Sequence, residues 1–125
     1  MRTLNTYFPL ANRSGGVKKI QFSDILYLEG SVNYTLIHLA NGKVMVSSRT
    51  LLFHIEQTLD DSFIRIHRAY CVNRQYVKSV VKDYDTKYVL MEGGVRLSIS
   101  RRKGKDIKEF VTEANSLLLI ENNWI

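Results

Sequence analysis

Apolar and polar residues alternate with a period of two along most of the chain, a pattern typical of β-strands. Before residue 50 the alternation predicts strands at 17–22, 25–29, 34–39 and 43–48. The pair Asn41-Gly42 between the last two is typical of a hairpin turn. After residue 60 the alternation predicts further strands at 63–67, 70–72, 76–84, 88–91 and 95–99. The sequence therefore predicts a mainly β protein with about nine short strands.

Two segments follow helical spacing instead. Residues 50–59 place Leu52, Ile55 and Leu59 on one face, which predicts a short helix in the middle of the chain. Apolar positions between residues 107 and 118 also keep helical spacing, so we expect a C-terminal helix that begins near Ser100. The stretch before residue 17 shows no such order and is expected to be the loosest part of the chain.

The segment 63–77, FIRIHRAYCVNRQYV, begins as a strand and then departs from the pattern. Alternation places Ile64 and Ile66 on one face and Phe63, Arg65 and His67 on the other. The segment as a whole holds three arginines and no acidic residue that could pair with them. Folding stability alone does not explain so much unpaired positive charge in one segment. Binding of a ligand by these arginines would explain it.

Length and composition limit the class of protein. At 125 residues with 45% hydrophobic residues, the chain can bury one core without a disulfide or a structural metal. Its lone cysteine, Cys71, cannot form an internal disulfide and fits a reducing compartment. We find neither a signal-peptide core nor an apolar run of about 18 residues. A soluble, cytoplasmic protein is therefore expected.

The positive charge is concentrated in two tracts. The net charge is +6 and the isoelectric point is near 9.6. Residues 62–82 and 93–105 each contain five basic residues and no acidic residue, so the rest of the chain is net negative. A polyanionic partner is the expected reason, and the alternative is a solvated basic surface without a ligand.

Catalytic, metal and cofactor sites are not indicated. Cys71 and His67 are close in sequence, but Cys71 lies in an apolar strand, where a buried thiol is a poor nucleophile. Two S-x-x-K matches, beginning at Ser79 and Ser100, lack the companion motifs of the hydrolases that use this sequence. The histidines fall on different predicted elements without nearby carboxylates at ligand spacing. We expect no enzyme activity, no bound metal and no cofactor.

Several segments together resemble the LytTR-type DNA-binding domain of bacterial transcription regulators. They are IQFSDILYLEGSVNYTLIHLANGK, TLLFHIEQTL, FIRIHRAYCVNRQYV and LSISRRKGKDI, which occur in the family's order over residues 17–112. The resemblance implies an elongated, mainly β stack of small antiparallel sheets with a short helix in mid-chain and a C-terminal helix. It also implies that loops enter two successive major grooves, commonly at paired direct repeats. The expected organisation is an N-terminal extension over 1–16, the domain over 17–116 and a tail over 117–125.

The resemblance maps the family's DNA contacts onto three loops. It implies base contacts from Asn33, Tyr34, Arg68, Ser100, Arg101 and Arg102, and a phosphate contact from Ser31. Further phosphate contacts are expected from the other basic residues Arg65, Arg74, Lys78 and Lys103. Chemically, Asn33 can pair with adenine and Arg68 with guanine. Asn33 and Asn73 could instead shape turns, and His67 is expected to point inward and bond to neighbouring backbone.

The function expected is sequence-specific binding of double-stranded DNA in transcription regulation, with a homodimer on DNA as an option. The alternative is an interaction module that modulates a separate signalling partner, and RNA binding is a more distant possibility. No membrane partner is expected. Because 16 residues cannot hold a receiver domain, the chain is expected to act as a stand-alone module if it is complete. Its Ala69 replaces a serine or threonine that is frequent in the family.

Overall fold

The chain folds into three small antiparallel sheets. The structure is a computed structural model, and it describes residues 6–12 and 14–100. The first sheet is a hairpin of β1 (Tyr7–Ala11) and β2 (Val17–Gln21). The second sheet has five strands in the order β5-β4-β3-β7-β6, and the third has three strands in the order β10-β9-β8.

The predicted strands are all present, with bounds that differ by at most two residues at either end. The second sheet contains β3 (Ile25–Gly30), β4 (Thr35–Leu39), β5 (Val44–Ser47), β6 (Phe63–His67) and β7 (Tyr70–Asn73). The third contains β8 (Val77–Asp83), β9 (Thr86–Met91) and β10 (Arg96–Ser98). The connections include the helix α1 (Leu51–Gln57) and the 3-10 turns η1 (Phe22–Asp24) and η2 (Arg74–Tyr76).

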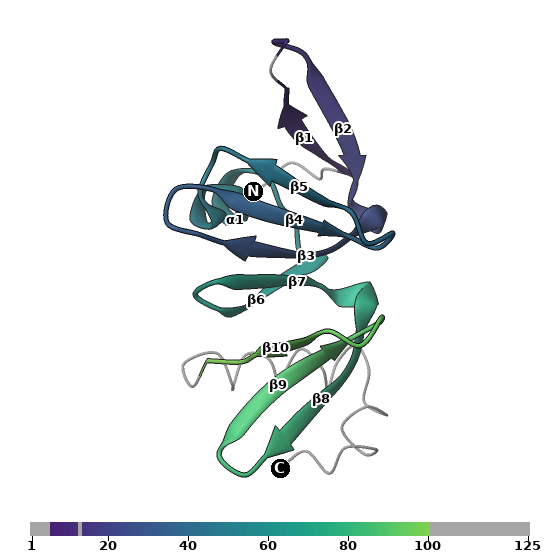
Figure 1. Ribbon diagram of the computed structural model, residues 1–125, viewed down its shortest axis with the longest axis vertical. Helices are drawn as coiled ribbons and strands as arrows, with labels where there is room; N and C mark the ends of the chain where they lie inside the picture. Colours follow the sequence, from purple (N-terminus) through teal and green to yellow (C-terminus); the bar gives the residue numbers. More distant parts are fainter. Residues whose placement is uncertain (1–5, 13, 101–125) are drawn as a thin grey trace.

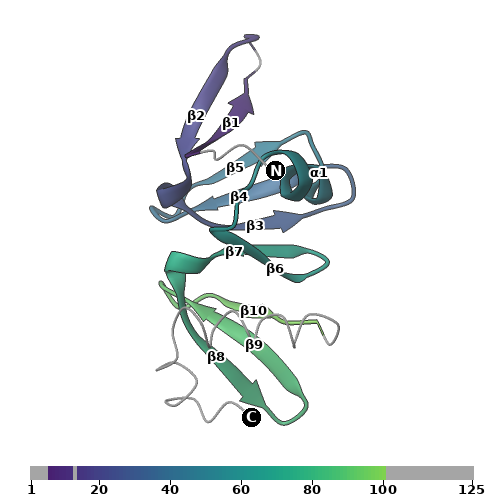
Figure 2. The same cartoon turned by 180° about the vertical axis from the view of Figure 1, so that it is seen from behind.

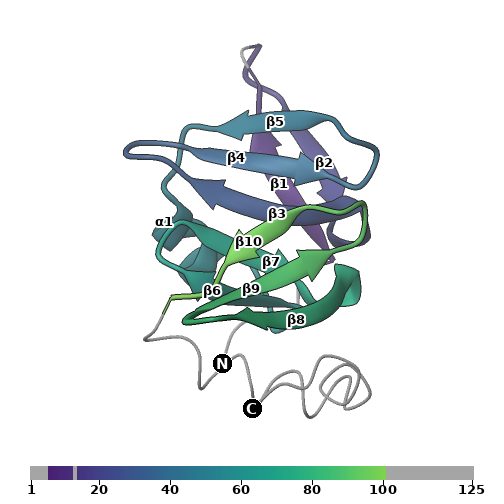
Figure 3. The same ribbon diagram turned by 60° about the horizontal axis from the view of Figure 1, so that its bottom comes forward.

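The sheets follow one another along the long axis of the molecule (Figure 1). The β1–β2 hairpin is at one end, the five-stranded sheet is in the middle and the β8–β10 sheet is at the other end. Figure 2 shows α1 beside the five-stranded sheet, from behind. In Figure 3 the β8–β10 sheet lies over β6 and β7, and β4 and β5 extend beyond it. The mainly β, elongated fold is therefore confirmed.

Two hydrophobic clusters hold the sheets together. The first joins the β1–β2 hairpin and α1 to one face of the five-stranded sheet, and it includes Phe8, Leu28 and Leu51. The second joins the other face to the β8–β10 sheet, and it includes Val80 and Met91. Each fully buried aliphatic or aromatic side chain in them contributes about 1.5–3 kcal/mol of burial free energy. The middle strands are thus buried on both faces.

The alternation in β6 produces this two-sided burial. Phe63 belongs to the first cluster, whereas Ile66 belongs to the second and Ile64 packs against it, as the period of two predicts. Neighbouring residues of β7 divide in the same way, with Cys71 in the first cluster and Val72 in the second. Cys71 is 2% exposed, and burial raises the pKa of its thiol to about 12, so its prediction as a core residue is confirmed.

Two features of the N-terminal half differ from expectation. Residues 7–11 are not loose: they form β1, whose Phe8 is completely buried. The buried face of α1 is predicted only in part: Ile55 and Leu59 pack in the first cluster as expected, but Leu52 is 50% exposed, and Leu51 and His54 point into the core instead. The helix is docked by its first residue, and this rotation brings a histidine into the interior.

Asn73 is more than the turn residue that was predicted. Its side-chain oxygen accepts a hydrogen bond from the Gln75 N–H at 3.2 Å, which is the expected turn interaction. Its side-chain amide also donates to the carbonyls of Phe22 at 2.9 Å and Ile25 at 2.8 Å. Asn73 is 1% exposed, so these bonds satisfy buried carbonyls and join η1 to the end of β7.

The predicted C-terminal helix lies outside the described residues, and so do the predicted tail 117–125 and the basic residues after Ser100. Within residues 6–12 and 14–100, α1 is the one α-helix, and no helix is long and apolar enough to cross a membrane.

Candidate nucleic-acid interface

Four separate segments of the chain meet at one end of the strands. The backbone N–H of Gly30, at the end of β3, donates to the carbonyl of Ala69 in the β6–β7 turn at 2.8 Å. The Thr35 hydroxyl, at the start of β4, donates to the carbonyl of Arg49 before α1 at 2.8 Å. The Ser100 N–H, after β10, donates to the carbonyl of Ile66 at 2.9 Å. We call this end the loop edge, comprising residues 31–34, 48–50, 68–69 and Ser100; its loops lie at the left in Figure 1.

The loop after β3 is fixed against the start of α1. A Cβ atom added to Gly30 would lie 2.9 Å from Cβ of Leu51, so the close approach requires glycine. The Ser31 N–H donates to the Tyr34 carbonyl at 2.9 Å, which closes the loop. Ser31, Asn33 and Tyr34 are all exposed. The loop therefore presents its polar side chains to solvent from a well-held backbone.

The β6–β7 turn presents Arg68 in a similar way. The Arg65 guanidinium donates to the carbonyls of His67 at 3.3 Å and Arg68 at 2.7 Å. The Ala69 N–H donates to Nδ1 of His67 at 3.1 Å, which confirms that this histidine bonds to neighbouring backbone, although its ring is only half-buried. With the turn held on both sides, the Arg68 side chain is exposed at the loop edge.

A groove of about 490 Å³ runs between these segments. Ser31 and Val32 line one part of it, Leu52 of α1 lines another, and Arg65 and Arg68 supply its positive charge. The described residues that line it include no acidic residue. An arginine pair beside small polar and aliphatic side chains suits a ligand that carries negative charge and also has apolar groups. DNA has both, in its phosphates and in the edges of its bases.

Arg49 is a further basic residue at the loop edge, and the sequence offered no signal for it. Its backbone N–H donates to the Ser47 hydroxyl at 3.2 Å, and its guanidinium lies 4.7 Å from the centre of the Phe53 ring. Thr50 next to it caps α1, because its hydroxyl accepts from the Phe53 N–H at 3.2 Å. Arg49 is exposed and directly precedes Thr50, which lines the groove, so it adds positive charge to the loop edge.

Beneath Arg49 lies a buried polar chain centred on His54. Nε2 of His54 is 2.7 Å from the Ser47 hydroxyl, and Nδ1 is 3.0 Å from the Thr58 hydroxyl. Burial, and secondarily the nearby charge of Arg49, lowers the pKa of His54 to about 4. The ring is therefore neutral at pH 7 and bonds at both nitrogens, which fixes the end of β5 to α1.

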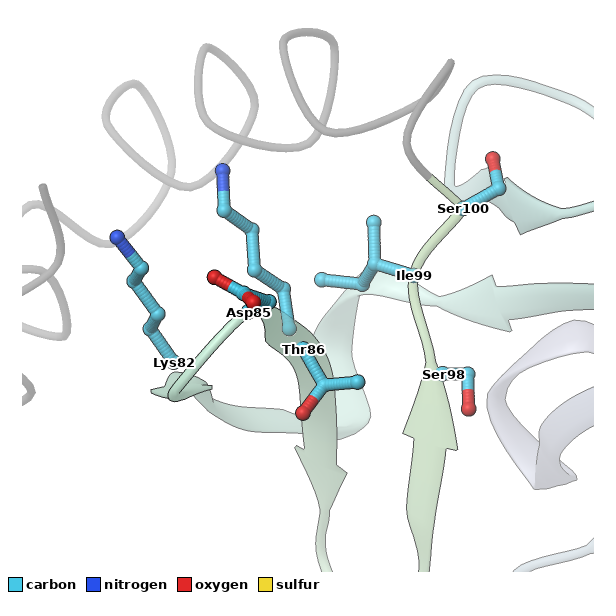
Figure 4. A pocket seen from close by; sticks show the side chains of 7 residues that line it. Lys82, Asp85, Thr86, Ser98, Ile99 and Ser100 are labelled. Atoms are coloured by element: carbon cyan, nitrogen blue, oxygen red, sulfur yellow. The ribbon is translucent and has the colours of Figure 1, made fainter.

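A second hollow, of about 610 Å³, adjoins the loop edge on the side of the third sheet (Figure 4). Lys82, Asp85 and Thr86 border it from the β8–β9 hairpin, and Ser98 at the end of β10 borders it with the following Ile99 and Ser100. Ser100 thus belongs both to the loop edge and to this hollow. Among the described residues that line this hollow, Asp85 offsets part of the charge of Lys82 and Lys87, whereas the described lining of the groove has no acidic residue.

The structure brings together some of the predicted site residues and separates others. Six of them lie at or beside the loop edge: Ser31, Asn33, Tyr34, Arg65, Arg68 and Ser100. Arg74 and Lys78 lie in η2 and at the start of β8, which are at the opposite end of the strands in Figure 1. Arg101, Arg102 and Lys103 lie outside the described residues. Among the described residues, no group of three or more His, Cys, Asp or Glu could hold a metal ion.

Comparison of the sequence with known proteins identifies relatives of this chain. The chain is 28% identical over 94 residues to the sensory transduction protein LytT of Bacillus subtilis (strain 168), which covers 74% of this chain and 38% of LytT. It is 34% identical over 76 residues to the transcriptional regulatory protein LytR of Staphylococcus aureus (strain N315), which covers 59% of this chain and 30% of LytR. The chain thus spans well under half the length of these relatives.

A solved structure and a family model agree on the type of domain. The fold matches a solved LytTr DNA-binding domain from Bacillus cereus with a TM-score of 0.71 and 22% identity, covering 86% of this chain and 98% of that one. The model of the LytTr DNA-binding domain family matches residues 15–112, which include the whole loop edge. That family binds DNA and is not a family of enzymes. The chain therefore belongs to the LytTr DNA-binding domain family.

Proposed function

We propose that this protein is a transcription regulator that binds specific sequences of double-stranded DNA through the loop edge. The observation that carries the proposal is the convergence of four segments, which places the exposed Asn33, Tyr34 and Arg68 beside a groove without acidic residues. Loops of this size can insert into a major groove, where each base pair presents its own pattern of hydrogen-bond groups.

The side chains at the loop edge divide into two roles. Arg68 is suited to read guanine, because its turn is held by Arg65 and its guanidinium is exposed. Asn33 is suited to read adenine, and Tyr34 and Ser100 supply further polar contacts. Ser31, Arg49 and Arg65 are suited to bind phosphates, which position the protein without reading sequence. Arg101, Arg102 and Lys103 follow Ser100 directly in the sequence, and we include them in the proposal as DNA contacts.

Arg74 and Lys78 are not assigned to this interface, because they lie at the far end of the strands. This makes Lys78 a useful control. It is exposed and cationic like Arg68, and a change in net charge alone would affect both variants equally.

The first experiment selects bound sites from a random pool of double-stranded DNA and then titrates the best site. We expect a defined sequence, with paired direct repeats if two copies bind together. If about six to eight phosphates are neutralised, log K should fall against log salt with a slope of about −5 to −7. A module that instead binds a signalling protein would select no sequence and would show a slope near zero on DNA.

The second experiment compares two substitutions on that site. Arg68→Ala should cost about 1–3 kcal/mol and remove the preference at one base pair. Lys78→Ala should leave the preference intact and change the affinity little. Equal losses on all sequences for both variants would show that Arg68 does not read a base.

A further inference from the structure

An exposed aliphatic side chain stands among the polar residues of the loop edge. Val32 lies between Ser31 and Asn33 and is 86% exposed. A single exposed valine is common on protein surfaces and by itself indicates nothing. Val32 is unusual because Leu52, which is 50% exposed, lines the same groove from α1, so two aliphatic side chains flank the groove that contains Arg68.

The backbone around Val32 is held in place. Gly30 bonds to the β6–β7 turn, and Ser31 bonds back to Tyr34 across the loop. Because valine is branched at Cβ, its side chain has few rotamers and loses little entropy when it makes a contact. The loop thus presents a fixed apolar group two residues before Tyr34 and beside Arg68, where no contact within the described residues buries it.

DNA has a matching apolar group. In the major groove the C5-methyl group of thymine is the one aliphatic feature among hydrogen-bond donors and acceptors, and it is contacted by small apolar side chains. We propose that Val32 contacts a thymine methyl group, with Leu52 as the apolar wall of the same groove, so that the loop edge prefers thymine at one base pair. This inference rests on the proposed function, and it adds a determinant of specificity that forms no hydrogen bond.

The expected size follows from the area of one methyl group. Removing a contact of this kind should weaken binding about fourfold, which corresponds to about 0.8 kcal/mol for one buried methylene-sized group. An effect of this size at one position is distinct from the loss of a bidentate arginine contact, for which about 1–3 kcal/mol is expected.

The test deletes the methyl group from the DNA and the valine from the protein. Each thymine of the selected site is replaced in turn by deoxyuridine, which lacks only the methyl group. The wild-type protein should lose affinity about fourfold at one thymine of each repeat. Val32→Ala should bind the thymine and uracil versions of that position almost equally. Val32 is almost fully exposed, so its replacement should leave the fold intact, as a denaturant melt can verify.

A matched control uses Val44, which is 50% exposed at the start of β5 and far from the loop edge. Val44→Ala should keep the full effect of the methyl group. A uracil scan without any effect, on a site that is still bound selectively, would overturn this inference and leave the proposed function standing. An effect that persists in Val32→Ala would also overturn it. If no sequence is selected at all, the proposed function itself fails.

Discussion

Protonation of the buried His54 should make folding stability depend on pH. The side chain is 3% exposed, and its two ring nitrogens are engaged by the hydroxyls of Ser47 and Thr58. Burial, followed by the positive charge of Arg49, lowers its pKa to about 4, whereas histidine in an unfolded chain has a pKa of about 6.5. The folded state therefore resists a proton that the unfolded state accepts.

The direction and size of the effect follow from this difference in pKa. Above pH 6.5 both states are neutral at His54, and its contribution to stability is fully present. Between about pH 6.5 and pH 4 the unfolded chain binds a proton and the folded protein does not, so the free energy of unfolding falls. The difference between 6.5 and about 4, at 1.36 kcal/mol per pKa unit, gives a loss of about 3 kcal/mol.

The assay is a series of urea melts between pH 4 and pH 7.5 on the wild type and on His54→Gln. Glutamine keeps a donor and an acceptor but does not titrate, so the variant should be less sensitive to pH by about 3 kcal/mol over this range. The control is His38→Gln, because His38 is only partly buried beside Glu29 and its loss should preserve the His54 effect. Parallel pH profiles for the wild type and His54→Gln would refute the assignment of a neutral, buried His54.

Three further changes probe other parts of the molecule. Asn73→Ala should destabilise the fold by about 2–5 kcal/mol in a urea melt, because it leaves the buried carbonyls of Phe22 and Ile25 without their donors. The control Asn41→Ala removes one exposed hydrogen bond in a turn and should cost far less. Alkylation of Cys71 in the native state should be slow by mass spectrometry, and rapid labelling with loss of DNA binding would indicate an accessible, functional thiol. Arg101→Glu combined with Arg102→Glu should abolish DNA binding. The double change should also raise the free energy of unfolding by about 0.3–1 kcal/mol per charge, since acidic residues suit the first turn of the predicted C-terminal helix. A strong loss of stability would mean that these arginines support the fold.

The sequence by itself determined the elements that depend on neighbouring residues. The period of two identified the nine predicted strands, and it divided Phe63 and Ile66 between opposite faces of β6. The Asn41-Gly42 turn was also recognisable, since Gly42 adopts a positive φ of 91°. These features could be predicted because alternation and turn chemistry act over a few residues.

β1 was missed although Phe8 and Leu10 alternate with exposed positions. Five residues are a short signal, and Pro9 lowers the strand propensity of a segment that in fact lies in a two-stranded hairpin. The buried face of α1 was predicted only in part, at Ile55 and Leu59 but not at Leu52, for a related reason. A seven-residue helix shows barely two turns of pattern, and its docking through Leu51 beside Gly30 decides which residues are buried.

Tertiary structure alone decided the composition of the loop edge. Its segments are far apart in the sequence, and they meet because β3 pairs with β7 and because Thr35 and Ser100 bond to distant carbonyls. Strand order also places Arg49 at the loop edge and separates Arg74 and Lys78 from Arg68. It likewise brings Asn73 close enough to bond to η1. Strand order is set by the burial of both faces of the middle sheet, a property of the whole chain that no local pattern contains.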